Sequence, residues 1–186
     1  MMNTERKIYF LTGIKHSGKS NVGRNAASLI AREMNAVFVD TDDLIVQALP
    51  AGYSCIRDFY RREGKDAFMD LEYRTLKQYL SSVKEDLTFI IATGGGACDN
   101  TRMVSLMKES GTVLYLCLKE ETLLKRIQKK GIPPFLDEND IENSFHTLFI
   151  SRDREYRHIC DFVVPLEDLK SIEHNGQVLA SFIVHI

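Results

Sequence analysis

Short apolar runs alternate with amphipathic segments along the chain. Apolar runs at residues 8–12, 36–39, 88–92, 112–118 and 161–164 predict buried β-strands. Between them, apolar side chains recur at helical spacing, which predicts helices near residues 21–33, 44–48, 56–60, 68–80, 101–110, 121–129, 141–159 and 172–183. Strands that alternate with helices in this way favour an α/β fold, in which a parallel sheet is covered by helices on both faces.

Composition narrows the class of protein. The chain has 186 residues, which predicts one domain with a full core. Its net charge of −2 gives no electrostatic reason to expect nucleic acid or a membrane surface as a partner, and no apolar run is long enough to span a bilayer. The short polar N-terminus predicts no signal peptide. We expect reduced thiols in a cytoplasmic protein, because the widely spaced cysteines form no metal-binding pattern: Cys55, Cys98, Cys117 and Cys160.

Residues 13–20 read GIKHSGKS and match the phosphate-binding loop pattern G-x-x-x-x-G-K-[ST] at every fixed position. An expected strand precedes them and an expected helix follows, so backbone N–H groups at the start of the helix can meet an anion. Lys19 is therefore expected to reach the β- and γ-phosphates of a nucleotide, and Ser20 to hold Mg²⁺. The alternative is a chance glycine-rich turn. We expect His16 to be a solvent-facing loop residue rather than a catalytic one.

Two acids follow the second expected strand. Asp40 ends this apolar run, and Asp42 comes two residues later. In open α/β sheets the carboxyl ends of the strands carry the ligand crevice. With a phosphate-binding loop nearby, the acids predict a metal ligand and an acceptor for a substrate hydroxyl. The alternative is a pair of N-caps that open the helix from Asp43.

Three later segments are candidates for ligand contact. The glycines at 94–96 follow a strand and can expose backbone N–H groups to a ligand, or can form a flexible turn. The polar segment at 130–140 is a candidate lid over the nucleotide. On the expected helix 141–159, a basic cluster either binds a ligand or forms a solvated helix face: Arg152, Arg154 and Arg157.

Taken in order, these motifs resemble the shikimate kinase family, a branch of the P-loop fold related to nucleoside monophosphate kinases. The resemblance covers roughly residues 8–164 and is carried by the phosphate-binding loop, the Asp40-Thr41-Asp42 triplet, the Gly64…Phe68…Glu72 spacing, the ATGGG run at 92–96 and the Arg152…Tyr156 spacing. It implies a three-layer P-loop kinase fold with a five-stranded parallel sheet in the order 2-3-1-4-5. It also implies a single domain over 1–186, with a substrate-binding helical region at about 42–82 and a lid at about 129–140.

The resemblance further implies transfer of the γ-phosphoryl group of ATP to the 3-hydroxyl of shikimate by a monomer, with Mg²⁺ as cofactor. Lys19 would stabilise the transferring group, and Asp42 would act on the attacking hydroxyl as base or orienting group. Ser20 and Asp40 would hold Mg²⁺. The residues implied for the substrate are Asp42, Gly94, Gly95, Gly96 and Arg152. Those implied for the nucleotide are Gly13, His16, Ser17, Gly18, Lys19, Ser20, Asn21 and Arg126, the last against the adenine.

Two arginines of the family pattern are missing. Met69 stands where the family has an arginine for the shikimate carboxylate, and Lys65 replaces the glutamate of the preceding Gly-Glu pair. Pro133 replaces the lid arginine that reaches over the phosphates. Lys65, Lys129 or Lys130 could substitute in part, although a lysine does not reproduce a bidentate fork. The alternatives are therefore a related kinase acting on a sugar acid or polyol, and a nucleotide-binding protein that no longer catalyses.

Overall fold

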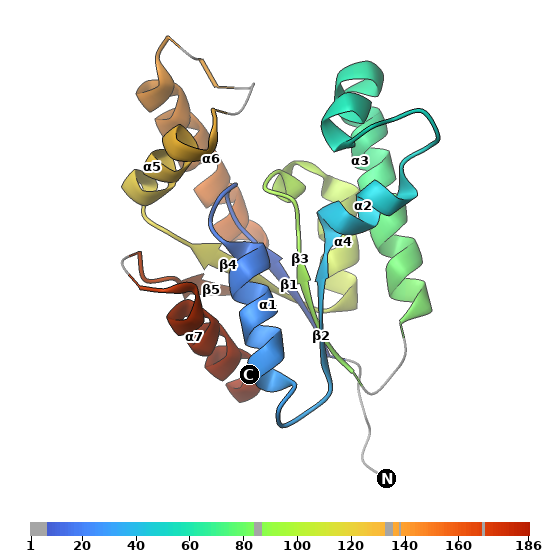
Figure 1. Ribbon diagram of the computed structural model, residues 1–186, viewed down its shortest axis with the longest axis vertical. Helices are drawn as coiled ribbons and strands as arrows, with labels where there is room; N and C mark the ends of the chain where they lie inside the picture. Colours follow the sequence, from blue (N-terminus) through green and yellow to red (C-terminus); the bar gives the residue numbers. More distant parts are fainter. Residues whose placement is uncertain (1–6, 84–86, 133–135, 138, 169) are drawn as a thin grey trace.

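A single parallel sheet forms the centre of the molecule (Figure 1). The computed structural model describes residues 7–83, 87–132, 136–137, 139–168 and 170–186. The strand order is β2-β3-β1-β4-β5, which confirms the order implied by the family resemblance. The strands are β1 (Lys7–Thr12), β2 (Ala36–Asp40), β3 (Thr88–Ala92), β4 (Thr112–Cys117) and β5 (Phe162–Pro165).

The helices lie close to where the apolar spacing predicts them. They are α1 (Lys19–Ile30), α2 (Thr41–Ala48), α3 (Ile56–Ser82), α4 (Thr101–Ser110), α5 (Glu120–Lys130), α6 (Ile141–Ile159) and α7 (Ile172–His185), with a short 3₁₀ turn η1 (Ala97–Asp99). The two helices expected at 56–60 and 68–80 share α3, which Gly64 interrupts with φ 85° and ψ −178°. Glycine adopts this conformation without the steric cost that a Cβ would add.

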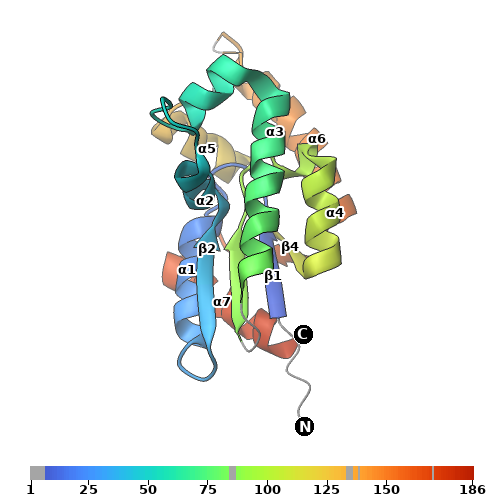
Figure 2. The ribbon, with the colours of Figure 1, turned by 90° about the vertical axis from the view of Figure 1, so that its right-hand side faces the viewer.

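Alternation along β1 builds the two sides of the core. Tyr9 and Leu11 pack with buried side chains of α1 and α7, whereas Ile8 and Phe10 pack with those of α3 and α4. Successive side chains of a strand point to opposite faces, so a fully apolar strand must be covered on both sides. Figure 2 shows α1 on one side of the sheet and α3 and α4 on the other. The three-layer α/β architecture predicted from the sequence is thereby confirmed.

Strand register brings three loops to one edge of the sheet. Ala92 near the end of β3 is aligned with Leu11 of β1 on one side and with Asp40 of β2 on the other. The strands are parallel, so the segments that follow them leave the sheet at the same edge. The phosphate-binding loop, the acids after β2 and the glycines after β3 therefore meet there.

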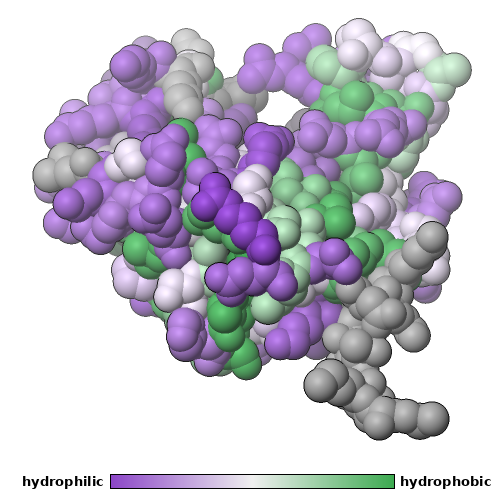
Figure 3. Space-filling view, turned by 60° about the horizontal axis from the view of Figure 1, so that its bottom comes forward, coloured by the Kyte–Doolittle hydropathy of each residue, from purple (hydrophilic) through white to green (hydrophobic). Residues whose placement is uncertain are grey.

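The surface is mixed in character. Hydrophilic side chains dominate the face shown in Figure 3, with hydrophobic side chains in smaller groups between them. Within the described ranges, no helix is long and apolar enough to cross a membrane. All four cysteines are free thiols, as expected from their spacing.

Gly111→Ala should destabilise the fold. An added Cβ would overlap the backbone oxygen of Ile8 and lie 2.8 Å from the Cβ of Ile8, which cannot move without disturbing the central strand. We expect a loss of about 1–3 kcal/mol in the free energy of unfolding, the usual cost of overpacking. Urea denaturation measures it, with Ser105→Ala on the exposed face of α4 as the control. Equal midpoints for the two variants would contradict the packing described above.

Candidate active site

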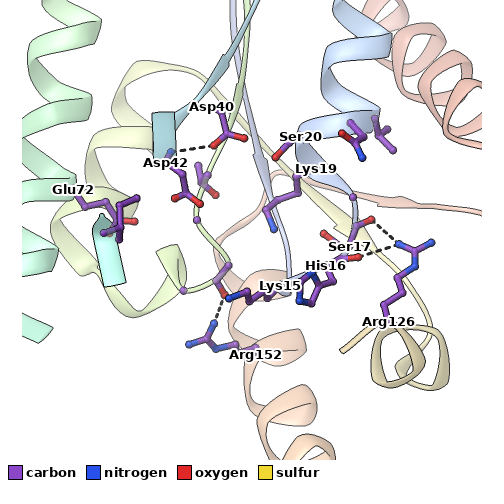
Figure 4. A pocket seen from close by; sticks show the side chains of 18 of the residues that line it. Lys15, His16, Ser17, Lys19, Ser20, Asp40, Asp42, Glu72, Arg126 and Arg152 are labelled. Carbon is purple, nitrogen blue, oxygen red and sulfur yellow. Dashed lines mark hydrogen bonds between the residues drawn. The ribbon is translucent and has the colours of Figure 1, made fainter. Parts of the chain in front are cut away.

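A deep pocket opens at the carboxyl edge of the sheet, and Figure 4 shows it at close range. Its volume is about 1220 Å³. One side is formed by the phosphate-binding loop and the turn at residues 94–96, and the opposite side by α3. A cavity of this size and mixed lining has room for a nucleotide and a second small molecule.

The phosphate-binding loop has the conformation that its glycines predict. Gly13 and Gly18 have φ values of 149° and 98°, and α1 begins directly after Gly18. A Cβ on Gly13 would lie 2.8 Å from the backbone oxygen of Leu116, so only glycine fits. No side chain caps the start of α1, which leaves its first N–H groups for an anion.

Lys19 is a buried cation at the base of this loop. Its side chain is 8% exposed, and its Nζ donates hydrogen bonds to the backbone oxygens of Gly13 at 2.7 Å and Ile14 at 3.3 Å. Burial lowers the pKa of Lys19 to about 8, and the nearby charges of Asp42 and Asp40 oppose this shift. A bound phosphate would add negative charge beside the ammonium and favour its charged form.

The two acids after β2 have different environments. Asp40 caps α2, its Oδ1 accepting a hydrogen bond from the Asp42 backbone N–H at 3.0 Å, so this residue is an N-cap, although the helix begins at Thr41 rather than at Asp43. Asp42 projects into the pocket on the side facing Lys19 (Figure 4). Burial in the pocket and then the Asp40 charge raise the pKa of Asp42, while Lys19 and Lys15 lower it. One short segment thus caps α2 through Asp40 and places the Asp42 side chain in the pocket.

The turn at residues 94–96 packs directly against other parts of the site. A Cβ on Gly95 would lie 2.9 Å from the backbone nitrogen of Lys15, so glycine allows the two loops to touch. A Cβ on Gly94 would lie 3.4 Å from Glu72 Oε1 and 3.5 Å from Asp42 Oδ1. Gly94 is therefore a close-contact position beside the two acids, and Gly95 is one against the phosphate-binding loop.

Only one arginine of the basic cluster on α6 belongs to the pocket. Arg152 has a side chain that is 15% exposed, and it donates hydrogen bonds to the Gly95 backbone oxygen and to Asp99 Oδ2, the latter at 2.9 Å. Arg154 and Arg157 are more exposed and pair with neighbours on their own helix. Of the three arginines, Arg152 therefore lines the pocket, whereas the other two lie on a solvated helix face.

Arg126 and His16 lie together at the nucleotide side. Arg126 Nη1 donates hydrogen bonds to the backbone oxygens of His16 at 3.0 Å and Ser17 at 3.4 Å, so α5 supports the phosphate-binding loop. His16 is half-buried and has φ 68°, a left-handed conformation uncommon for residues other than glycine. The expectation of a plain solvent-facing residue is therefore incomplete, because the His16 backbone is part of this contact.

Several lining residues are not evident from the sequence. Glu72 stands out there only by its spacing from Gly64 and Phe68, yet it is 4% exposed and accepts a hydrogen bond from Asn100 Nδ2 at 2.9 Å. Burial raises the pKa of Glu72 to about 7. At the other end, the pocket is lined by Val22, Leu118, Leu166, Lys170, Ile172 and Asn175. A periodic pattern gives no signal for these, because such a pattern does not separate a pocket wall from core.

The structure describes some of the residues that depart from the family pattern. Met69 and Lys65 both line the pocket, on the side formed by α3. Lys129 is exposed and is not among the pocket-lining residues, and Pro133 falls outside the described residues. Within the described part of the chain, the arginines that line the pocket are Arg57 and Arg61 of α3, Arg126 of α5 and Arg152 of α6.

Known proteins share this combination of sequence and fold. A sequence model of the family described as Shikimate kinase matches residues 15–183. The shikimate kinase of Paracidovorax citrulli is 31% identical over 176 residues, which cover 95% of this chain and 87% of the relative. A solved shikimate kinase from Acinetobacter baumannii, in complex with shikimate, gives a TM-score of 0.79 at 25% identity and covers 98% of this chain and 95% of its own. The structure from Aquifex aeolicus gives 0.70 at 26% identity, covering 96% of each chain.

The fold and the loop at the end of its central strand define a P-loop kinase of small molecules. The chain belongs to the shikimate kinase family. The resemblance found from the motifs alone is thereby confirmed, and ATP-dependent phosphorylation of shikimate is the activity that the family match supports.

Glu72→Gln should change how stability depends on pH. Burial raises the pKa of Glu72 from 4.5 to about 7, so between these values the folded protein binds more protons than the unfolded chain, and stability falls as the pH rises. The neutral amide avoids burying a charge. We expect the variant to be more stable than the wild type by roughly 1–3 kcal/mol near pH 8 and equal to it near pH 4. Urea denaturation at both pH values measures the difference, and an advantage of the same size at both would contradict the assignment.

Proposed function

We propose that this protein transfers the γ-phosphoryl group of ATP to the 3-hydroxyl of shikimate, with its own residues in the roles given below. The observation that carries the proposal is the placement of Asp42 in the pocket wall that faces Lys19 at the phosphate-binding loop. Phosphoryl transfer needs positioning and charge stabilisation more than covalent chemistry, and an acid opposite a loop lysine supplies both.

The nucleotide binds along the loop and the start of α1 in this proposal. Free N–H groups after Gly13 and Gly18 hold the phosphates, and Lys19 stabilises the charge that develops on the transferred group. Arg126 lies against the adenine while its Nη1 supports the loop. The remaining nucleotide contacts are assigned to His16, Ser17, Ser20 and Asn21, all of which line the pocket.

The donor set near the loop fits Mg²⁺. Ser20 offers a hydroxyl and Asp40 a carboxylate, both on the pocket wall, and Mg²⁺ prefers such hard oxygen ligands together with substrate phosphates and water. The ion would neutralise charge on the β- and γ-phosphates. Asp40 is held in place for this role because it also caps α2.

Asp42 orients the attacking hydroxyl and accepts its proton. Burial raises the pKa of Asp42 and the charge of Lys19 lowers it, and a carboxylate within reach of the attacking hydroxyl can orient that hydroxyl and take its proton. Gly94, Gly95 and Gly96 contact the substrate through their backbone, and Arg152 faces its carboxylate. In this arrangement the helical region at about 42–82 covers the substrate and the segment at about 129–140 is the lid. A monomeric state and a cytoplasmic location remain predictions.

One observation favours a second candidate. Met69 contributes a neutral thioether to the substrate side of the pocket, which suits a related kinase whose hydroxylated substrate has no carboxylate at that point. Coupled ATPase assays with shikimate, a sugar acid and a polyol distinguish the two. ATP binding without turnover on any of them would instead support a nucleotide-binding protein that no longer catalyses.

Lys19→Ala should abolish phosphoryl transfer. The ammonium acts on charge that develops on the γ-phosphoryl group, and loss of such a preorganised donor costs about 100- to 1000-fold in kcat. Initial rates with shikimate at saturating ATP measure the loss, and circular dichroism checks that the fold survives. Turnover near that of the wild type would overturn the kinase assignment.

Asp42→Asn should separate binding from catalysis. The amide keeps the shape of the side chain and cannot take a proton, so we expect kcat to fall by roughly 100- to 10,000-fold while the affinity for Mg·ATP changes by less than about twofold. Calorimetry with a non-hydrolysable ATP analogue and steady-state rates measure the two effects. If nucleotide affinity falls and turnover persists, the roles of Asp40 and Asp42 are exchanged.

A further inference from the structure

Two cationic side chains reach the glycine turn at residues 94–96 from different elements. Arg152 comes from α6, and its guanidinium lies within 3.4 Å of where a Cβ of Gly96 would be. Lys15 comes from the phosphate-binding loop, and its backbone lies within 3.0 Å of where a Cβ of Gly95 would be. Figure 4 shows the Lys15 side chain extending toward Arg152 along this turn. Both residues line the pocket.

The backbone of Lys15 packs against Gly95, whereas its ammonium group is accessible. The contact with Gly95 fixes where the side chain starts, and the residue is exposed within the pocket. Among the residues that the structure describes, the Lys15 ammonium makes no hydrogen bond or ion pair. A lysine in this state can take an incoming anion without first breaking a bond within the protein.

Arg152, by contrast, already faces an anion. Its Nη2 donates a hydrogen bond to Asp99 Oδ2 at 2.9 Å, and its Nη1 donates to the Gly95 backbone oxygen. The Asp99 carboxylate offsets part of the guanidinium charge, so a substrate carboxylate at Arg152 alone would be incompletely compensated. A second cation beside Arg152 corrects this deficit.

The wall at Met69 gives a carboxylate no charge at the position of the family arginine. The thioether is neutral, and the backbone oxygen of Met69 accepts a hydrogen bond from Asn100, whose amide also binds the buried Glu72. A substrate carboxylate placed there would approach this acid. The cations that α3 gives to the pocket are Arg57 and Arg61, before the break at Gly64, and Lys65, on the same helical segment as Met69.

The position of Lys15 also agrees with that of the reacting hydroxyl. In shikimate the carboxylate and the 3-hydroxyl are carried by ring carbons that one other carbon separates. A cation for the carboxylate must therefore lie in the same part of the pocket as the acid for the hydroxyl. Lys15 and Asp42 meet neighbouring residues of one turn, since a Cβ on Gly95 would lie 2.9 Å from the Lys15 backbone nitrogen and a Cβ on Gly94 would lie 3.5 Å from Asp42 Oδ1.

We propose that Lys15 is a substrate-binding residue, which pairs with the shikimate carboxylate beside Arg152 and replaces the cation absent at Met69. This inference rests on the proposed function, in which shikimate is the substrate. Lys15 thus gives the phosphate-binding loop a second role, because one face of the loop binds nucleotide and this side chain selects the acceptor.

The first test is Lys15→Met, which keeps an unbranched side chain and removes the charge. We expect the KM for shikimate to rise about 10- to 100-fold, the loss of one charge-assisted hydrogen bond. The KM for ATP and the nucleotide affinity by calorimetry should change by less than about twofold. Lys15→Arg should remain near the wild type. The matched control is Lys125→Met on the exposed side of α5, outside the pocket, which should leave both constants unchanged.

The second test removes the charge from the substrate. The methyl ester of shikimate keeps the ring and the hydroxyls, so the preference for acid over ester in KM should be about 10- to 100-fold smaller in Lys15→Met than in the wild type, with Arg152 accounting for any preference that is left. The four KM values form a double-mutant cycle, in which the residue and the substrate are changed separately and together, and they isolate the interaction between Lys15 and the carboxylate. An equal penalty on acid and ester, or a rise in the KM for ATP, would overturn the inference and assign Lys15 to the hydroxyls or phosphates.

The two proposals can fail separately. If the unaltered protein does not phosphorylate shikimate at saturating ATP and Mg²⁺, the proposed function falls and this inference falls with it. If the unaltered protein is active and Lys15→Met retains its KM for shikimate, only the inference is overturned. Thermal unfolding checks each variant, and Lys15→Gln repeats the test should the methionine variant fail to fold.

Discussion

Parallel alignment of β1, β2 and β3 is the constraint on which the site depends. Leu11 and Asp40 are both in register with Ala92, so the three chain segments that follow these strands leave the sheet at one edge. Each segment has a different chemistry: backbone N–H groups and a lysine, two acids, and a glycine turn. An antiparallel pairing would send neighbouring segments to opposite edges and separate the phosphates from the acceptor.

Close approach of these loops then sets the electrostatics. Because residues 94–96 lack side chains, the turn packs against the phosphate-binding loop at Lys15. For the same reason it lies close to the carboxylates of Glu72 and Asp42. Lys19 is buried against backbone oxygens, and Asp42 faces it in the pocket. Groups that are already oriented and partly dehydrated stabilise developing charge without reorganising, which is the main requirement of phosphoryl transfer.

Charge is distributed unevenly over the acceptor side of the pocket. The wall on α3 carries Met69 and the buried acid Glu72 together with the cations Arg57, Arg61 and Lys65, whereas Lys15 and Arg152 lie at the glycine turn. In the arrangement that we propose, the substrate carboxylate binds the two cations at the turn. On this view, the missing family arginine does not remove the carboxylate site but moves its positive charge to another element, while the acid that faces the hydroxyl keeps its place.

The order of strands and helices, the phosphate-binding loop and the break at Gly64 follow from the sequence alone. Apolar periodicity and backbone freedom are local properties, so neighbouring residues are enough to predict them. Contacts between distant segments are not local. Only the tertiary structure shows that Lys15 lies beside Arg152 and that Glu72 is buried at the pocket wall. It also shows that Arg152 lines the pocket while Arg154 and Arg157 on the same helix face solvent. Burial and partners set the charge state and role of such side chains, and both are decided by packing between elements that no sequence window contains.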